Sequence, residues 1–174
     1  SAASDVYKRQ NYNCPVVAYY PELLAANVPS LKKVRYLNPY FGLHRPKDFE
    51  RKASEWFFNE FQVPKRETAA AVKAAYAAYD AYVHDVRETG MKYIRHARDH
   101  HMPILVACGR PYHIDPEINH GINDLITSFG FVLVTEDALS YLEGYAPRKV
   151  LNQWTFQSRM YNAARYVCCL LYTS

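Results

Sequence analysis

The sequence predicts an α/β protein in which parts of two Rossmann-like parallel-sheet subdomains are joined by long helices. Three observations predict this class: short apolar runs in both halves, a strand–helix–strand pattern over 104–134, and an alanine-rich helical stretch over 65–101. The chain has 174 residues, 49% of them hydrophobic and 22% charged, which is an ordinary composition for a globular domain.

The chain divides into three structural segments between two terminal ones. Residues 11–45 form the end of a first α/β subdomain, 46–102 a helical connection, and 103–167 a second α/β subdomain. The segments 1–10 and 168–174 resemble translated adapter sequence at the ends of metagenomic gene fragments, and we leave them out of the fold prediction. We therefore expect an internal fragment of a longer protein.

The sequence of residues 11–45 predicts two short strands. An apolar run over 14–20 ends at Pro21 and indicates a buried strand, which a short helical turn over 23–27 follows. A second strand is expected over 34–37, and 41–45 is a loop.

Two helices follow. Pro46 suits a first helical turn, and 47–61 carries aromatic residues at helical spacing until Pro64 stops the helix. The stretch 65–101 has abundant alanine and an apolar stripe at i, i+4 and i+7 spacing, with Gly90 as an expected break or bend.

After Pro103 the pattern becomes that of a βαβ unit. The continuous apolar run 104–108 predicts a strand buried on both faces. Asp115 is placed to cap a helix that runs to 129, and Gly130 closes it before a second strand over 131–134. The last helix is expected over 149–167.

The loop 109–121 is the richest in chemical groups. Ligands of open parallel sheets bind outside the carboxyl ends of the strands, and this loop directly follows such an end. Glu136 follows the second strand and is expected to face the same crevice. The candidate ligand residues are therefore Arg110, Tyr112, His113, Glu117, His120 and Glu136.

Each of these residues also has a structural interpretation. Asp115 and Glu117 suit a helix cap, His120 a packed or surface position on a helix, and Arg110 an ion pair with a neighbouring carboxylate. The loop is nevertheless more polar than a connector needs, so we expect a ligand or subunit contact. No glycine-rich phosphate-binding motif follows either strand.

Candidate metal ligands are few. Cys14 could bind iron or zinc as a thiolate, although a single cysteine is usually a small buried hydrophobe, and Cys108 is expected in the core. His96 and His100 lie on one helix face at a spacing that can hold a metal, but a solvated basic face is the favoured interpretation.

Composition excludes several function classes. The net charge of +4 is small and scattered, which argues against nucleic-acid binding. The longest apolar runs are far shorter than the roughly 20 residues of a membrane span. With no signal peptide and no disulfide framework, a cytoplasmic location is expected.

Several sequence blocks resemble one family. They are NCPVVAYYPE (13–22), PYFGLHRPKDFE (39–50), GRPYHIDPEINHGINDLI (109–126), FVLVTEDAL (131–139) and VLNQWTFQSRMYNAA (150–164). Together they are similar to the large acyl-CoA dehydratase activase-related proteins of anaerobic bacteria, in the region related to 2-hydroxyacyl-CoA (2-hydroxyglutaryl-CoA) dehydratase subunits. The resemblance covers residues 11–167.

The resemblance implies an ATP-activated iron–sulfur redox protein. Family chains carry actin/Hsp70-like ATPase modules upstream and bind an iron–sulfur cluster, of the 4Fe–4S type, through cysteines. Cys14 matches the cysteine of the family's CPVV block, and the other ligands would lie outside this chain. The implied chemistry is low-potential electron transfer that supports dehydration of a CoA thioester. The implied partners are the activase ATPase modules or dehydratase subunits, with an acyl-CoA as substrate.

Two other functions remain open. One is a dehydratase-like docking module that has no cluster of its own. The other is a hydrolase or transferase that uses Arg110, His113 and Glu117 on a phosphorylated substrate.

Overall fold

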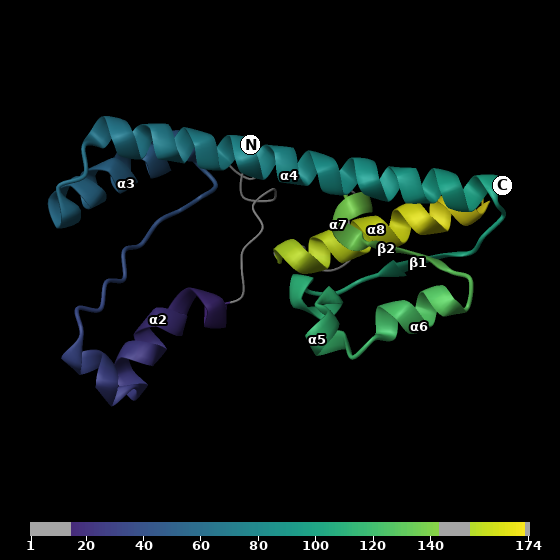
Figure 1. The fold of residues 1–174 in the computed structure, drawn as a ribbon, viewed down its shortest axis with the longest axis horizontal. Helices are drawn as coiled ribbons and strands as arrows, with labels where there is room; N and C mark the ends of the chain where they lie inside the picture. The colour runs from purple at the N-terminus through teal and green to yellow at the C-terminus, as the bar shows by residue number, and fades with distance from the viewer. Residues whose placement is uncertain (1–14, 143–153, 173–174) are drawn as a thin grey trace, which may run out of the picture. The chain divides into compact units, whose positions relative to one another are not determined.

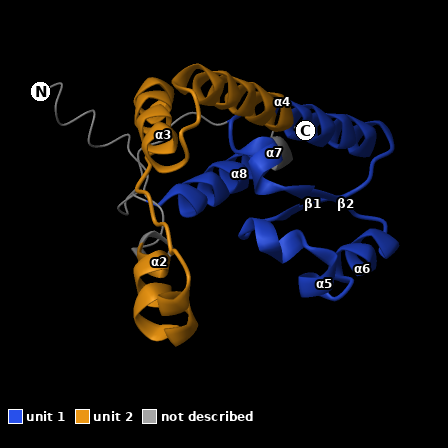
Figure 2. Ribbon diagram, turned by 60° about the vertical axis from the view of Figure 1, so that its left-hand side comes forward, with its two compact units in different colours: residues 1–14, 84–174 blue, residues 15–83 orange. Residues whose placement is uncertain are grey.

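The computed structural model describes residues 15–142 and 154–172, and most of these are helical (Figure 1). The chain forms two compact units (Figure 2). Unit 2 contains residues 15–83, and the described part of unit 1 begins at residue 84. No helix among the described residues is long and apolar enough to cross a membrane.

Unit 2 is helical. It contains α2 (Pro15–Asn27), the 3₁₀ helix η1 (Pro29–Lys33), α3 (Pro46–Phe61) and the first half of α4 (Lys65–Asp99). Pro46 occupies the first turn of α3, as predicted, and Gln62 ends it in the left-handed region with φ 57°. The N–H of Gln62 donates to the carbonyl of Phe58 at 3.0 Å, which satisfies one of the last helical carbonyls.

The two strands predicted in this region are wrong. The described residues of 14–20 belong to helix α2, which contains Pro21, and 34–37 pairs with no other strand. A strand needs a hydrogen-bonding neighbour, and the paired strands within the described residues are β1 (Ile104–Ala107) and β2 (Val132–Thr135), which pair only with each other. The helical turn predicted over 23–27 is confirmed as the end of α2, and the loop predicted over 41–45 is also confirmed.

Aromatic side chains join the loop before α3 to α3 and α4. Phe41 packs edge-to-face against Phe49 and Trp56, with ring centroids 5.5 and 5.9 Å apart. Phe49 meets Tyr76 of α4 at 6.1 Å, and the Tyr76 hydroxyl donates to the carbonyl of Leu43 at 2.7 Å. The aromatic spacing read from 47–61 therefore marks the packed face of α3.

Unit 1 contains the predicted βαβ arrangement. Strands β1 (Ile104–Ala107) and β2 (Val132–Thr135) are parallel, with Ile104 paired with Val132 and Ala107 with Thr135. Between them lie the 3₁₀ helix η2 (Pro111–Ile114), α5 (Pro116–Asn119) and α6 (Ile122–Ser128). After β2 come α7 (Glu136–Leu139) and α8 (Thr155–Tyr172).

The core of unit 1 forms where the second half of α4 meets the sheet, α7 and α8. Its buried side chains are Ile94, Ala97, Val132, Val134, Ala138, Leu139 and Ala163. Gly90 is also buried, and a Cβ on it would lie 2.5 Å from the Cβ of Ala138. The break expected at Gly90 does not occur, because this glycine serves the close approach of α4 and α7 within an unbroken helix.

Three other predictions need correction. All four residues of β1 are only partly buried, so this strand is not buried on both faces, whereas Val132 and Val134 of β2 are buried in the core. The helix expected over 115–129 is two helices, since His120 and Gly121 both have positive φ angles. The last helix begins at Thr155 within the described residues, and 149–153 lie outside them.

The α/β class is therefore confirmed in a coarse form. The described residues are mainly helical with one small parallel sheet, which falls short of the predicted pair of Rossmann-like subdomains. The proposed segment boundaries stay predictions.

Candidate functional site

The carboxyl ends of β1 and β2 lie at the same edge of the sheet. The register pairs Ala107 with Thr135, so the residues that follow each strand start from adjacent positions. Cys108, Gly109 and Arg110 continue from β1, and Glu136 begins α7 directly after β2. Several charged side chains therefore start from this one edge.

A buried ion pair lies at this edge. The Arg159 guanidinium from α8 contacts Glu136 Oε1 at 2.7 Å and Asp137 Oδ2 at 3.6 Å. Glu136 is only 5% exposed, and its Oε2 accepts a hydrogen bond from the backbone N–H of Asp137 at 2.8 Å. Burial raises the pKa of Glu136, the charge of Arg159 opposes that rise, and the Asp137 carboxylate adds to it.

Arg110 and Arg159 both contact the ring of Phe156. The Arg110 guanidinium lies 5.0 Å from the centroid of the Phe156 ring, and the Arg159 guanidinium lies 5.4 Å from the same centroid. Both distances suit a cation–π interaction. We call Arg110, Glu136, Asp137, Phe156 and Arg159 the arginine–carboxylate cluster.

The two arginines of this cluster differ in their partners. Arg159 is neutralised by two carboxylates, whereas Arg110 has no ion pair among the described residues. A guanidinium presents several donors in one plane, a geometry suited to a carboxylate or phosphate. Arg110 is therefore the member of the cluster that can bind an anionic group from outside.

His113 has a local structural role. Its Nδ1 accepts a hydrogen bond from the backbone N–H of Arg110 at 3.0 Å, which places the proton of the neutral ring on Nε2. The ring of Tyr112 lies 4.4 Å away, and a Cβ on Gly109 would come within 2.5 Å of His113 Nδ1. Gly109 thus leaves the space in which His113 closes the η2 turn.

Asp115 caps α5, as its sequence position suggested. Its Oδ1 accepts from the backbone N–H of Glu117 at 2.9 Å and of Ile118 at 3.3 Å. Glu117 and His120 are exposed, and no contact among the described residues brings either side chain to the arginine–carboxylate cluster. Of the six candidate residues, the structure brings Arg110 and Glu136 into this cluster.

Sequence reasoning missed the part played by α8. Neither Arg159 nor Phe156 is among the candidate residues that the sequence predicts. Their spacing of i and i+3 was a usable signal, because it puts an arginine and an aromatic ring on one helix face. Their partners, however, come from the loop after β1 and from α7, which only the tertiary fold brings to them.

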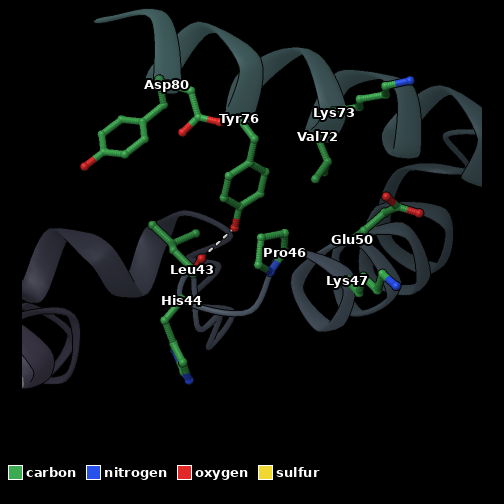
Figure 3. A pocket seen from close by; sticks show the side chains of 10 residues that line it. Leu43, His44, Pro46, Lys47, Glu50, Val72, Lys73, Tyr76 and Asp80 are labelled. Atoms are coloured by element: carbon green, nitrogen blue, oxygen red, sulfur yellow. Dashed lines mark hydrogen bonds between the residues drawn. The ribbon is translucent and has the colours of Figure 1, made fainter. Parts of the chain in front are cut away.

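A concave surface lies between α3, α4 and the loop before α3, all within unit 2 (Figure 3). Its volume of about 450 Å³ falls in the range of small-molecule pockets. Charged and aromatic side chains line much of it, among them Lys47, Glu50, Lys73, Tyr76, Tyr79 and Asp80. Two lysines and two carboxylates are among the lining residues, so the lining favours no single sign of charge.

The described residues do not fit an iron–sulfur cluster. No group of three or more histidine, cysteine, aspartate or glutamate side chains in residues 15–142 and 154–172 could hold a metal. Cys108 is exposed, which corrects its expected place in the core, because β1 ends one residue earlier at Ala107. Partial desolvation and the nearby Glu136 charge raise the pKa of the Cys108 thiol. Cys14, the predicted metal ligand, lies outside the described residues.

Comparison with protein families matches residues 2–139 to the CoA enzyme activase uncharacterised domain. This range contains β1, β2, Arg110 and Glu136, and also most of the segment 1–10. Comparisons with curated proteins and with solved structures gave no match. Because the family match covers most of the 174 residues, the chain belongs to the CoA enzyme activase domain family and is an acyl-CoA dehydratase activase-related protein.

Proposed function

We propose that this chain is part of an ATP-activated iron–sulfur redox protein that supplies low-potential electrons for dehydration of a CoA thioester. The family match over residues 2–139 carries this proposal. In such a system the ATPase modules lie outside this chain, and either they or dehydratase subunits are its partners.

The chain's own contribution to the cluster is limited to one proposed ligand. Cys14 stands directly before α2, and its thiolate would bind iron together with cysteines from outside this chain. Cys108 is a poor second ligand, because its raised pKa favours the protonated thiol. The other cysteines among the described residues, Cys168 and Cys169, lie in the segment 168–174 that resembles adapter sequence, so we propose neither as a ligand.

The iron content of the anaerobically reconstituted full-length protein tests this proposal. We expect Cys14→Ser to lower the iron bound per chain and Cys108→Ser, the matched control, to leave it unchanged. Iron content that is unchanged in Cys14→Ser contradicts the ligand assignment. A wild-type protein that takes up no iron contradicts the redox proposal as a whole.

Arg110 is the residue that we propose contacts an anionic ligand at the sheet edge. It lies in the arginine–carboxylate cluster without a carboxylate partner of its own among the described residues. An acyl-CoA offers phosphates that suit a guanidinium. Tyr112, His113, Glu117 and His120 remain candidates on the same loop, and Glu136 positions Arg159.

A docking module without a cluster is the second candidate function. The observation that favours it is the lack of a metal-ligand group among the described residues, together with exposed apolar side chains on unit 2. Tyr19, Tyr40 and Leu43 are 63%, 87% and 64% exposed. Retained binding of a dehydratase subunit by an iron-free preparation would favour this candidate.

The geometry of the loop 109–121 does not support the hypothesis of a hydrolase or transferase. His113 uses Nδ1 to close a turn, and the exposed Glu117 makes no contact with Arg110. If a metal-free preparation of the wild type turns over a phosphorylated substrate and His113→Ala does not, the hydrolase or transferase hypothesis is supported.

A further inference from the structure

Two histidines stand side by side near the end of α4. His96 and His100 are one helical turn apart, both are exposed, and their ring centroids lie 4.2 Å apart with a 32° angle between the planes. Metal–nitrogen bonds of about 2.0 to 2.1 Å allow two nitrogens on one ion to lie up to about 4 Å apart. The two rings are near neighbours, as a shared ion requires.

A backbone hydrogen bond prepares one of these rings for metal binding. His100 Nδ1 lies 2.9 Å from the carbonyl oxygen of His96. A carbonyl oxygen only accepts, so Nδ1 of the neutral ring carries the proton and Nε2 carries the lone pair. Metal-bound histidines in proteins usually have this arrangement, in which the second ring nitrogen donates to a carbonyl or carboxylate and holds the ring in place.

The electrostatic surroundings contain opposing contributions. His96 lies in the last turn of a 35-residue helix, where the helix dipole favours a cation. Lys92, Arg95 and Arg98 are exposed neighbours that repel one, and Asp99 attracts one. Because all of these groups are in contact with water, screening weakens their effect more than it weakens direct coordination.

We propose that His96 and His100 chelate a divalent transition-metal ion of the nickel, copper or zinc type. Imidazole nitrogen is a preferred ligand of these ions. With no third protein ligand in the described residues, water or another molecule completes the coordination. The ligands of this site are imidazole nitrogens, whereas an iron–sulfur cluster is bound by thiolates. The proposed site is therefore independent of the proposed redox function.

Titration of Ni²⁺ into the chain tests the site. The protein carries no polyhistidine tag, and its cysteines are blocked with a maleimide so that thiolates do not compete. Calorimetry should show one Ni²⁺ bound per chain, released by a chelator. His96→Ala and His100→Ala should each weaken binding by about 100-fold, because two ligands on one scaffold act at a high effective concentration.

His84→Ala is the matched control. His84 is exposed on the same helix and has no histidine four residues away on either side. It should bind Ni²⁺ as the wild type does. Wild-type affinity in His100→Ala, or an equal loss in His84→Ala, overturns the proposal. Circular dichroism of each variant establishes that α4 is intact.

Discussion

The contacts that stabilise the interior of unit 1 differ in kind from those that stabilise the interior of unit 2. Unit 1 has an aliphatic core in which Ile94 and Leu139 are completely buried between helices and sheet. In unit 2 the described buried side chains are small, and the larger contacts are aromatic rings at partly exposed positions. The small buried residues are Ala53, Ser54, Thr68 and Val72.

This difference has an energetic consequence. Burial of aliphatic side chains contributes in proportion to the area removed from water, and partly exposed rings leave much of that area in solvent. Edge-to-face pairs add roughly 0.5 to 1.5 kcal/mol each. The exposed ion pairs of unit 2, such as Arg35 with Glu60, add little, since surface salt bridges contribute about 0 to 1 kcal/mol. We therefore expect unit 2 to open more readily than unit 1.

The largest expected effect comes from Ile94→Ala. Ile94 is 0% exposed in the core of unit 1, so the change leaves a cavity and should lower the free energy of unfolding by about 3 to 4 kcal/mol. Urea denaturation measures this loss. Tyr93→Ala, at a neighbouring position that is 52% exposed, is the control and should change stability by less than about 1 kcal/mol. Equal losses of unfolding free energy in the two variants would contradict the assignment of Ile94 to the core.

A smaller and more local effect is expected from Trp56→Ala in unit 2. The Trp56 ring contacts Phe41, Phe57 and Phe61 at centroid distances of 5.9, 4.8 and 5.6 Å. Because Trp56 is only partly buried, we expect a loss of about 2 kcal/mol, below the range for fully buried aromatic residues.

Hydrogen exchange resolves where the Trp56→Ala effect lies. Amides of α3 should lose protection, while those of β1 and β2 keep theirs. The exposed Asn59→Ala on the same helix is the control and should alter neither set. Uniform loss of protection across both units would contradict the contrast between them.

The smallest expected effect is on the pH dependence of unit 1. Burial raises the pKa of Glu136 above its ordinary value of 4.5, so the folded state holds its proton to higher pH than the unfolded state does. Its contribution to stability is therefore fully present below pH 4.5 and is lost as pH rises through the folded-state pKa. Denaturation at a series of pH values should show this decline in the wild type and a flatter profile in Glu136→Gln. Identical profiles would show that Glu136 is not the group responsible.

Local sequence chemistry predicted several elements well. Pro46 and Pro64 bounded α3, because proline suits a first helical turn and cannot continue a helix. Asp115 capped α5, and Gly130 took the left-handed conformation that ends α6 before β2. The apolar runs on either side of these helices predicted the parallel pair β1 and β2.

The failures occurred where distant residues decide the outcome. The run at 14–20 has β-forming residues, but its described part forms a helix that continues into leucines and alanines, which are strong helix formers. Gly90 suggested a break because glycine is a weak helix former, yet the approach of Ala138 makes it the residue that fits.

For the candidate site, the sequence by itself determined that Arg110 and Glu136 follow adjacent parallel strands, because strand order and polarity follow from the βαβ pattern. It also determined that His96 and His100, at the end of α4 and just after it, lie on one side, because helical periodicity is a local property. Only the tertiary structure decided that Arg159 neutralises Glu136 and that Phe156 contacts both arginines. Such pairings join separate elements, and the packing of α8 against α7 and the sheet places their side chains within reach of one another.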